Sequence, residues 1–205
     1  MLGAGGHAKV VLDSLLMSGD HDVIGVLDPN PGACQLLRIP VLGGDDLLPT
    51  LGDVGFIAAV GDNDVRRRLF EGALRLGLEP VNAIHPSAVI SQHARLELGI
   101  AVMANAAINV GADIGQDAIV NTGAIIDHDT VVGAHVHIAP GCSLSGSVHV
   151  GDGAFLGTGV TVIDGVRIGE RAVVGAGTAV YRDVAAKAKI VGAPMRDITA
   201  TDSGA

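Results

Sequence analysis

Residues 124–141 read AIIDHDTVVGAHVHIAPG, and this stretch places an aliphatic residue at every sixth position, at Ile126, Val132 and Ile138. The same spacing continues in both directions without interruption, from Ile84 to Val180, over seventeen successive Ile, Leu or Val residues. Only 48% of the chain is hydrophobic, so chance does not produce a run of this length. The second half of the chain is therefore a repeat with a period of six residues.

Small residues accompany this repeat. Alanine is frequent two positions before the aliphatic residue, and glycine often follows it directly, at Gly115, Gly133, Gly151, Gly157, Gly169 and Gly175. The pattern is typical of a parallel β-helix, in which each hexad forms a short strand and a corner and three hexads close one triangular coil. The aliphatic side chain fills the prism, and we expect the glycine to tolerate the corner. Seventeen hexads, three to a coil, give between five and six coils.

The triplet Asp127-His128-Asp129 occupies outward-facing positions of this repeat, at an expected corner. Residues one coil apart should stack, so we expect His128 between Val110 and Gly146, with open space beside the ring at the glycine. A neutral imidazole is a general base near neutral pH, and an adjacent carboxylate fixes its tautomer. Either Asp127 or Asp129 could be that carboxylate. The competing interpretation is a solvated corner histidine.

Apolar residues at outward positions predict an interface. They are Val110, Ile119, Val131, Val136, Phe155 and Val173. An exposed apolar stripe usually marks a contact surface, so we expect a symmetric homo-oligomer with the Asp-His-Asp corner at a subunit boundary. His137 should stack between Ile119 and Phe155, either as a packing histidine or as a ligand contact. His135 and His137 lack a third ligand at suitable spacing, so no metal site is expected.

The first eighty residues carry a different signature. Gly3-Ala4-Gly5-Gly6-His7-Ala8 leads into an expected helix over residues 7–18, and an expected strand then ends at Asp28. A further strand over residues 54–60 precedes a helix with Arg66, Arg67 and Arg68, which we expect to form a solvated face, with Arg66 the best ordered of the three. Glycine-rich turns of this kind bind phosphates, and the acidic residue after the next strand accepts a hydrogen bond from a ribose hydroxyl. The size, half of a dinucleotide fold, favours a mononucleotide or a nucleotide sugar. Only Met1 and Leu2 precede the turn, so its first strand is nearly absent.

Charge and composition exclude several functional classes. The chain has 13 Lys and Arg against 22 Asp and Glu, a net charge of −9, which argues against a nucleic acid or an anionic membrane as partner. No apolar stretch is long enough to span a membrane, and two distant cysteines favour reduced thiols in a cytoplasmic protein. Residues 167–196 nevertheless carry six basic residues against two acidic ones, which suits the phosphates of CoA. They are Arg167, Arg171, Arg182, Lys187, Lys189 and Arg196.

Several motifs together resemble a known family, the bacterial nucleotide-sugar N-acetyltransferases, which are grouped with the sialic-acid O-acetyltransferases. The matching stretches are GAGGHAKVV (3–11), AVGDNDVR (59–66), VNAIHPSAVIS (81–91), NTGAIIDHD (121–129), FLGTGVTV (155–162) and VGAPMR (191–196). They run through nearly the whole chain. The organisation expected is an α/β Rossmann-like half domain over residues 1–80, a left-handed β-helix over 81–184, and a C-terminal extension and tail over 185–205.

The resemblance also implies an assembly and a site. It implies a homotrimer with acetyl-CoA in the groove between neighbouring β-helices, His128 as general base and Asp129 as its carboxylate partner. It places a group of residues along acetyl-CoA, namely His137, Gly146, Thr158, Gly175 and Arg196. It places another group around the nucleotide sugar, namely Gly5, Gly6, His7, Asp28 and Gly61.

The leading hypothesis is thus an acetyl-CoA-dependent N-acetyltransferase that acts on a nucleotide-linked 4-amino sugar by direct transfer, with His128 as general base. O-acetylation of a sugar hydroxyl or of a sialic acid is an alternative of the same chemical kind. A non-catalytic nucleotide-sugar-binding protein is a third possibility. An NAD-dependent oxidoreductase is disfavoured because a second nucleotide-binding half is lacking.

Overall fold

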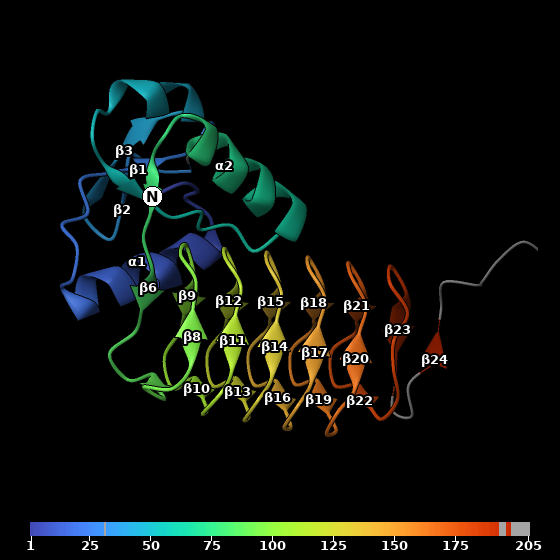
Figure 1. The fold of residues 1–205 in the computed structure, drawn as a ribbon. Coiled ribbons are helices and arrows are strands. Elements are labelled where there is room, and N and C mark those ends of the chain that lie inside the picture. The colour runs from blue at the N-terminus through green and yellow to red at the C-terminus, as the bar shows by residue number, and fades with distance from the viewer. Residues whose placement is uncertain (31, 193–195, 198–205) are drawn as a thin grey trace, which may run out of the picture.

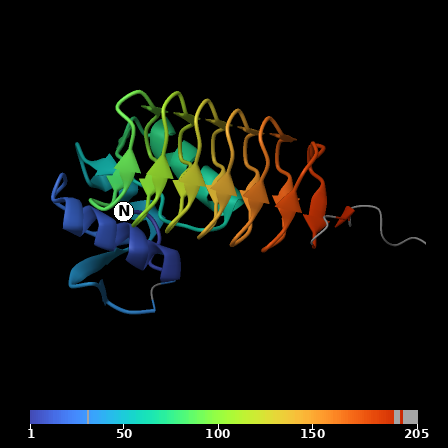
Figure 2. The ribbon, with the colours of Figure 1, turned by 90° about the horizontal axis from the view of Figure 1, so that it is seen from below.

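The computed structural model describes residues 1–30, 32–192 and 196–197, the last two by their backbone only. Figure 1 shows a triangular prism of stacked coils with a small α/β domain placed over its N-terminal end. Viewed from below, the coils follow one another along a single axis, and the C-terminal strands lie at the end farthest from this domain (Figure 2). The two predicted parts of the fold are confirmed: a Rossmann-like α/β half domain and a left-handed parallel β-helix of hexapeptide repeats.

Three parallel sheets form the faces of the prism. Face 1 consists of β6 (Ala83–Ile84), β9 (Ala101–Val102), β12 (Ile119–Val120), β15 (His137–Ile138), β18 (Phe155–Leu156), β21 (Val173–Val174) and β23 (Lys189–Val191), with β24 (Arg196–Asp197) antiparallel at its end. Face 2 consists of β7 (Val89–Ile90), β10 (Ala107–Ile108), β13 (Ile125–Ile126), β16 (Ser143–Leu144), β19 (Thr161–Val162) and β22 (Ala179–Val180). Face 3 consists of β8 (Arg95–Leu96), β11 (Asp113–Ile114), β14 (Val131–Val132), β17 (His149–Val150) and β20 (Arg167–Ile168).

The expected register is confirmed along the prism. Ile119 pairs with His137 and His137 pairs with Phe155, so residues 18 positions apart stack. The inward aliphatic residues and the alanines that precede them form one continuous buried core. The last coil is shorter, because Val173 pairs with Lys189, only 16 residues on. Face 1 thereby continues past residue 184, where the sequence placed the end of the prism.

Glycine occurs after the aliphatic positions for another reason than the corner conformation that we expected. A Cβ at Gly115 would lie 2.7 Å from the backbone nitrogen of Ala134, and one at Gly157 would lie 2.7 Å from that of Ala176. These glycines therefore allow the next coil to approach closely. The left-handed corner conformation falls on other residues, among them Asp117, Asp129 and His135, with φ of 56°, 57° and 59°.

The N-terminal domain is a small, mostly parallel sheet with helices. Its elements are α1 (Gly6–Ser18), β1 (Val26–Leu27), β2 (Gln35–Leu36), β3 (Ile39–Gly43), the 3₁₀ helix η1 (Asp45–Thr50), β4 (Gly55–Phe56), α2 (Asn63–Arg75) and β5 (Glu79–Pro80). Strand β2 runs antiparallel to β3. The expected first strand is reduced to Leu2, which still forms parallel bridges to Leu27 on one side and Ala58 on the other. From Leu2 the chain adds β1 and β3 on one side of the sheet and then crosses to the other side for the segment after β4. The strand order therefore reverses at Leu2, beside the glycine-rich turn. Open α/β sheets bind ligands at such a reversal.

The two domains share an apolar cluster. Helix α1 packs on β6, and Ala8 and Leu12 of this helix are buried together with Ala101 and Ile119 of face 1. The prediction of a continuous exposed apolar stripe is therefore wrong for Ile119, which this chain's own N-terminal domain covers. It is wrong as well for Val136, which is 0% exposed in the prism core.

The exposed part of the stripe lies elsewhere. Val110 and Val131 are 52% and 38% exposed, and both lie close to the Asp-His-Asp corner. Within the described ranges, no helix is long and apolar enough to cross a membrane.

Candidate active site

His128 lies at the corner where β13 leads to β14, between faces 2 and 3. Its side chain is 52% exposed, and Nδ1 lies 2.9 Å from Oδ2 of Asp129. Asp127 serves the backbone instead: its Oδ1 accepts a hydrogen bond from the amide of His128 at 2.7 Å and from the side chain of Asn109 at 2.8 Å. Of the two carboxylates that the sequence left open, Asp129 is the one that contacts the imidazole.

The charge around His128 favours a base that works near neutral pH. The hydrogen bond with Asp129 raises the pKa of His128 above its ordinary value, and Asp127 and Asp164 act in the same direction. A carboxylate only accepts hydrogen bonds, so Nδ1 carries the proton and Nε2 of the neutral ring holds the free lone pair. Nε2 is thus the ring nitrogen that can accept a proton.

The ring of His128 packs against Gly146, which lies one coil above it. A Cβ at this position would lie 2.6 Å from Nε2 of His128 and 3.0 Å from Oδ1 of Asp164, so even an alanine would displace the ring. The glycine is thus needed for the ring to fit, and the space expected beside the imidazole is occupied by the ring itself.

A first cavity, of about 350 Å³, lies at the carboxyl ends of the N-terminal strands. The glycine-rich turn forms one wall, and a Cβ at Gly5 or Gly6 would meet no atom within 4 Å. Gly5 caps α1 without a side chain, so the first amides of the helix lack an intrahelical acceptor and suit a phosphate. Asp28 lines the same cavity and accepts the amide of Ala4 at 2.7 Å. The residues assigned to the nucleotide sugar, Gly5, Gly6, His7, Asp28 and Gly61, all line it.

His137 of face 1 contacts two residues that line this cavity, Gly61 and His7. Its Nδ1 donates to the carbonyl of Gly61 at 3.0 Å, so Nε2 accepts from the side-chain amide of Asn121 at 3.1 Å. The rings of His137 and His7 lie 5.7 Å apart, and burial lowers the pKa of each to about 4. Both rings are therefore neutral at physiological pH. Sequence reasoning missed Asn121, because its role depends on a neighbour 16 residues away.

The other residues assigned to acetyl-CoA are spread over the prism. Thr158 and Gly175 lie on the corner between faces 1 and 2, where the amide of Gly177 donates to the carbonyl of Thr158 at 2.9 Å. Gly146 lies with His128 on the next corner. The side chain of Arg196 lies outside the described part of the structure.

A second cavity, of about 450 Å³, lies over face 1 beside α2. Gly61 lines both cavities, and Phe155 and Val173 supply an apolar floor here. Three of the basic residues noted in the sequence line this space, namely Arg171, Lys187 and Lys189. The positive charge expected near CoA phosphates thus borders one cavity. In the same described portion, no three His, Cys, Asp or Glu residues are grouped so as to hold a metal ion.

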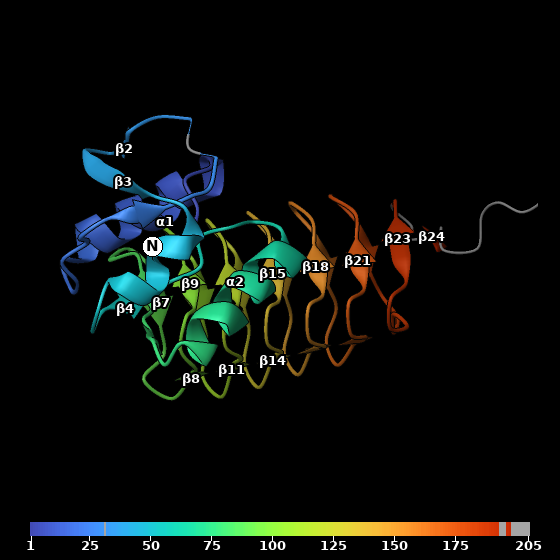
Figure 3. The ribbon, with the colours of Figure 1, turned by 90° about the horizontal axis from the view of Figure 1, so that it is seen from above.

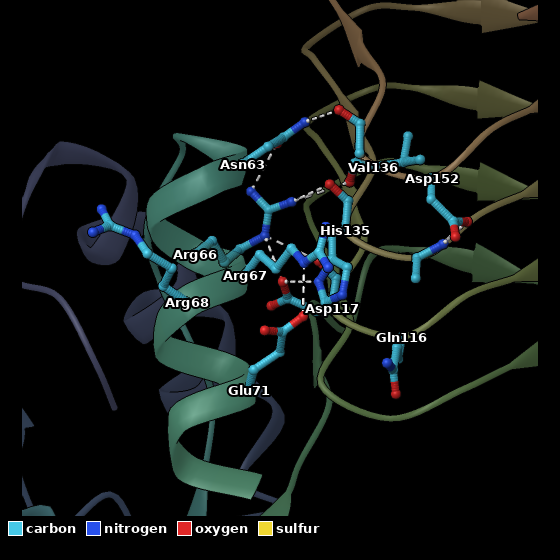
Figure 4. Close-up of polar contacts among 12 residues, drawn as sticks. Asn63, Arg66, Arg67, Arg68, Glu71, Gln116, Asp117, His135, Val136 and Asp152 are labelled. Atoms are coloured by element: carbon cyan, nitrogen blue, oxygen red, sulfur yellow. Dashed lines mark hydrogen bonds and ion pairs between the residues drawn. The ribbon is translucent and has the colours of Figure 1, made fainter. Parts of the chain in front are cut away.

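Helix α2 fixes the N-terminal domain to the prism (Figure 3). Arg66 is buried, and its guanidinium donates to the carbonyls of Asp117 at 3.0 Å and His135 at 2.7 Å. His135 in turn contacts the carboxylate of Asp117 at 2.8 Å (Figure 4). The expectation of a solvated Arg66–Arg68 face is wrong for Arg66, because this residue faces the prism whereas the next two face solvent.

Arg66 also holds the segment between the two cavities. Its guanidinium donates to the carbonyl of Val60 at 3.2 Å and to the side chain of Asn63 at 3.0 Å. Asn63 in turn donates to the carbonyl of Gly153 at 3.0 Å. The position of Gly61, and with it the hydrogen bond to His137, therefore depends on a buried cation.

Comparison with known proteins places this arrangement in a family. The chain matches the PglD N-terminal domain over residues 1–73 and the bacterial transferase hexapeptide (six repeats) over residues 147–182. A solved structure of a perosamine N-acetyltransferase variant from Caulobacter crescentus, with CoA and GDP-perosamine, is 45% identical and has a TM-score of 0.92. This match covers 96% of the present chain and 94% of the other. The chain belongs to the family of hexapeptide-repeat sugar N-acetyltransferases.

Two further members of this sugar N-acetyltransferase family support the assignment. The acetyltransferase domain of PglB from Neisseria gonorrhoeae, solved with acetyl coenzyme A, is 34% identical over 96% of this chain and 97% of that one, with a TM-score of 0.91. UDP-N-acetylbacillosamine N-acetyltransferase from Bacillus subtilis is 38% identical over 111 residues, which are 51% of this chain and 50% of that protein. The chain thus aligns with about half the length of this curated relative. The resemblance inferred from the sequence motifs is confirmed.

In this family member, His128 and the two cavities belong to different sides of one chain. His128 occupies the corner between faces 2 and 3, whereas both cavities lie between the N-terminal domain and face 1 or within the N-terminal domain itself. A single copy of the chain therefore presents the His128 imidazole and the two cavities in different directions.

Proposed function

We propose that this chain transfers the acetyl group of acetyl-CoA to the amino group of a nucleotide-linked 4-amino sugar. The observation that carries the proposal is the His128–Asp129 pair, in which Asp129 holds Nδ1 and leaves Nε2 as the ring nitrogen that can accept a proton. The nucleotide would occupy the first cavity, with its phosphates over the glycine-rich turn. The relatives solved with CoA, acetyl coenzyme A and GDP-perosamine support both ligands.

The chemistry is a direct transfer. The neutral amine attacks the thioester carbonyl, Nε2 of His128 takes the proton that the nitrogen loses, and the C–S bond breaks to release CoA. The imidazolium, stabilised by Asp129, returns its proton to the leaving thiolate. Cys142 is buried and its pKa is raised by burial, so it does not supply a thiolate nucleophile for an acyl-enzyme.

The base and the nucleotide meet between copies of the chain, in a homotrimer. Exposed apolar residues surround the His128 corner, and a neighbouring copy seated there would cover them. They are Val89, Val110, Ile125 and Ile163. A mixed assembly tests this arrangement: His128→Ala and His7→Ala proteins, each inactive alone, should regain activity when co-assembled. Absence of any recovery in mixed oligomers would exclude a shared site.

Thiol release tests the reaction itself. The protein is incubated with acetyl-CoA and with GDP- and UDP-linked 4-amino sugars or their hydroxyl counterparts, and free CoA is followed. Release with amino sugars only, lost in His128→Ala, is the expected result. Release with hydroxyl sugars only would show an O-acetyltransferase. No release with any acceptor, under conditions where nucleotide sugar binds, would show a binding protein.

A further inference from the structure

The carboxyl ends of the N-terminal strands divide the first cavity into successive parts. Gly3 follows the bridge residue Leu2, Asp28 follows β1, and Gly44-Asp45 follow β3. Strands β1 and β3 are parallel, and the amide of Asp28 donates to the carbonyl of Gly43 at 2.8 Å. In folds of this kind the turn after the first strand takes the phosphates and the acidic residue after the second takes the ribose. Asp45, one strand farther out, therefore lies where the nucleobase belongs.

Asp28 is already held by the backbone. Its Oδ2 accepts from the amide of Ala4 at 2.7 Å, and its Oδ1 accepts from the amide of Asn30 at 2.8 Å. These bonds fix the carboxylate and leave one lone pair on each oxygen for a hydroxyl. Asp28 is thus pre-positioned for the ribose rather than free to adapt to a base.

Asp45 is in the opposite condition. It lines the cavity, yet its Oδ1 is shielded from solvent and has no hydrogen-bond partner among the residues that the structure describes. Burial raises the pKa of this carboxyl, and the charges of Asp28 and Asp46 raise it further. An unpaired, shielded acceptor of this kind is costly, and the cost would be relieved if the side chain turned toward the cavity that it lines and accepted from donors of a ligand.

The donors that fit one carboxylate are those of guanine. Its N1–H and its 2-amino group lie side by side and match the two oxygens of a carboxylate, whereas uracil places its single N3–H between two carbonyl oxygens that a carboxylate repels. We infer that Asp45 is a specificity-determining residue that accepts from the N1–H and the 2-amino group of guanine and selects guanine nucleotide sugars. The inference rests on the proposed function, whose amino sugar would extend the other way, toward Gly61 and His137.

Calorimetric titration of the full-length protein with GDP, IDP and UDP tests this selection. IDP differs from GDP only by the missing 2-amino group. We expect the native protein to bind GDP about ten- to a hundredfold more tightly than IDP or UDP, the range for a good bidentate contact to a base. In Asp45→Asn, which keeps the shape, the GDP advantage should fall to within about threefold while UDP affinity stays the same. Asp46→Asn, an exposed neighbour outside the cavity lining, should behave as the native protein does.

Several outcomes would overturn the inference: native affinities for GDP and IDP that are equal, a native preference for UDP, or an equal loss of all three nucleotides in Asp45→Asn. Comparing ligands within one protein keeps the test valid even where a variant is less stable. The measurement needs no acetyl transfer. A GDP preference carried by Asp45 in a protein that acetylates no amino sugar would retain this inference and refute the proposed function. Transfer to UDP sugars without a GDP preference would do the reverse.

Discussion

The guanidinium of Arg66 lies 3.2 Å from the carboxylate of Asp117, and neither side chain is more than 1% exposed. Burial acts against both charges, because it lowers the pKa of Arg66 and raises that of Asp117. Arginine keeps its proton in proteins, so the carboxylate is its counter-ion. The pair joins the N-terminal domain to the prism, and it is therefore part of what places Gly61 near His137.

Replacing Arg66 should destabilise the whole chain. In Arg66→Met the carboxylate of Asp117 stays buried without its cation, and we expect the free energy of unfolding to fall by about 3–5 kcal/mol. Arg67→Met is the matched control, because Arg67 forms an exposed pair with Glu71 at 2.7 Å and should cost less than about 1 kcal/mol. Urea unfolding measures both. Equal losses in the two variants would show that the buried pair does not hold the domains together.

Replacing Asp129 should move the pH profile of acetyl transfer. In the proposed mechanism His128 accepts a proton in its neutral form, so kcat should fall as the pH drops through the pKa of His128. The contact with Asp129 raises that pKa. Asp129→Asn should therefore shift the acidic limb of the profile to lower pH and reduce kcat about a hundredfold, because the tautomer is no longer fixed. A shift in the opposite direction would contradict the assigned contact.

Adding a methyl group at Gly146 should displace the imidazole. The new Cβ of Gly146→Ala would collide with the ring of His128, and a displacement near 1 Å costs about a hundredfold in rate. We expect kcat to fall by about this amount while the melting temperature changes little. Gly72→Ala is the control, since its Cβ would meet only a distant Arg75 nitrogen at 3.9 Å. A fully active Gly146→Ala enzyme would mean that the close contact between Gly146 and the His128 ring plays no part in positioning the imidazole.

Stability should fall on acidification because of His137. Burial lowers its pKa from 6.5 to about 4, so between these values the unfolded chain binds a proton that the folded chain excludes. The stabilisation is complete above pH 6.5 and is lost as the pH falls toward 4, on the order of 3 kcal/mol. His137→Gln, which does not titrate, should show a flatter dependence of unfolding free energy over this range. His7, which is also neutral and buried, is present in both proteins. If the unfolding free energies of the two proteins depended on pH in the same way, the contribution assigned to His137 would be refuted.

The prism could be predicted from the sequence because the backbone of each coil imposes a period of six residues. The Asp127–Asp129 corner was found in the same way, since its outward-facing position follows from the period. The period alone did not separate Asp127 from Asp129. The family resemblance implied Asp129, and the structure shows Asp129 in contact with the imidazole, at a corner where its φ is 57°.

Contacts between the domains could not be predicted in this way. Arg66 resembles its solvated neighbours in sequence, and only the docking of α2 on the prism shows that it is buried. Ile119 shares the pattern of an interface residue but is covered by α1 of the same chain. Asn121 has no local signal, as its partner His137 belongs to the next coil.

Helix α2 rests on one edge of the prism. Phe70 packs at Gly99, Arg66 binds Asp117 and His135, Asn63 binds Gly153, and Asp64 contacts Arg171 at 2.9 Å. These five edge residues recur every 18 positions, so the helix contacts five successive coils, one residue in each. A whole extra coil inserted beyond Arg171 would lengthen the prism and leave all of these contacts in place. The same insertion between Asp117 and His135 would separate the two groups that one guanidinium holds, so the prism can be lengthened beyond Arg171 but not beneath α2.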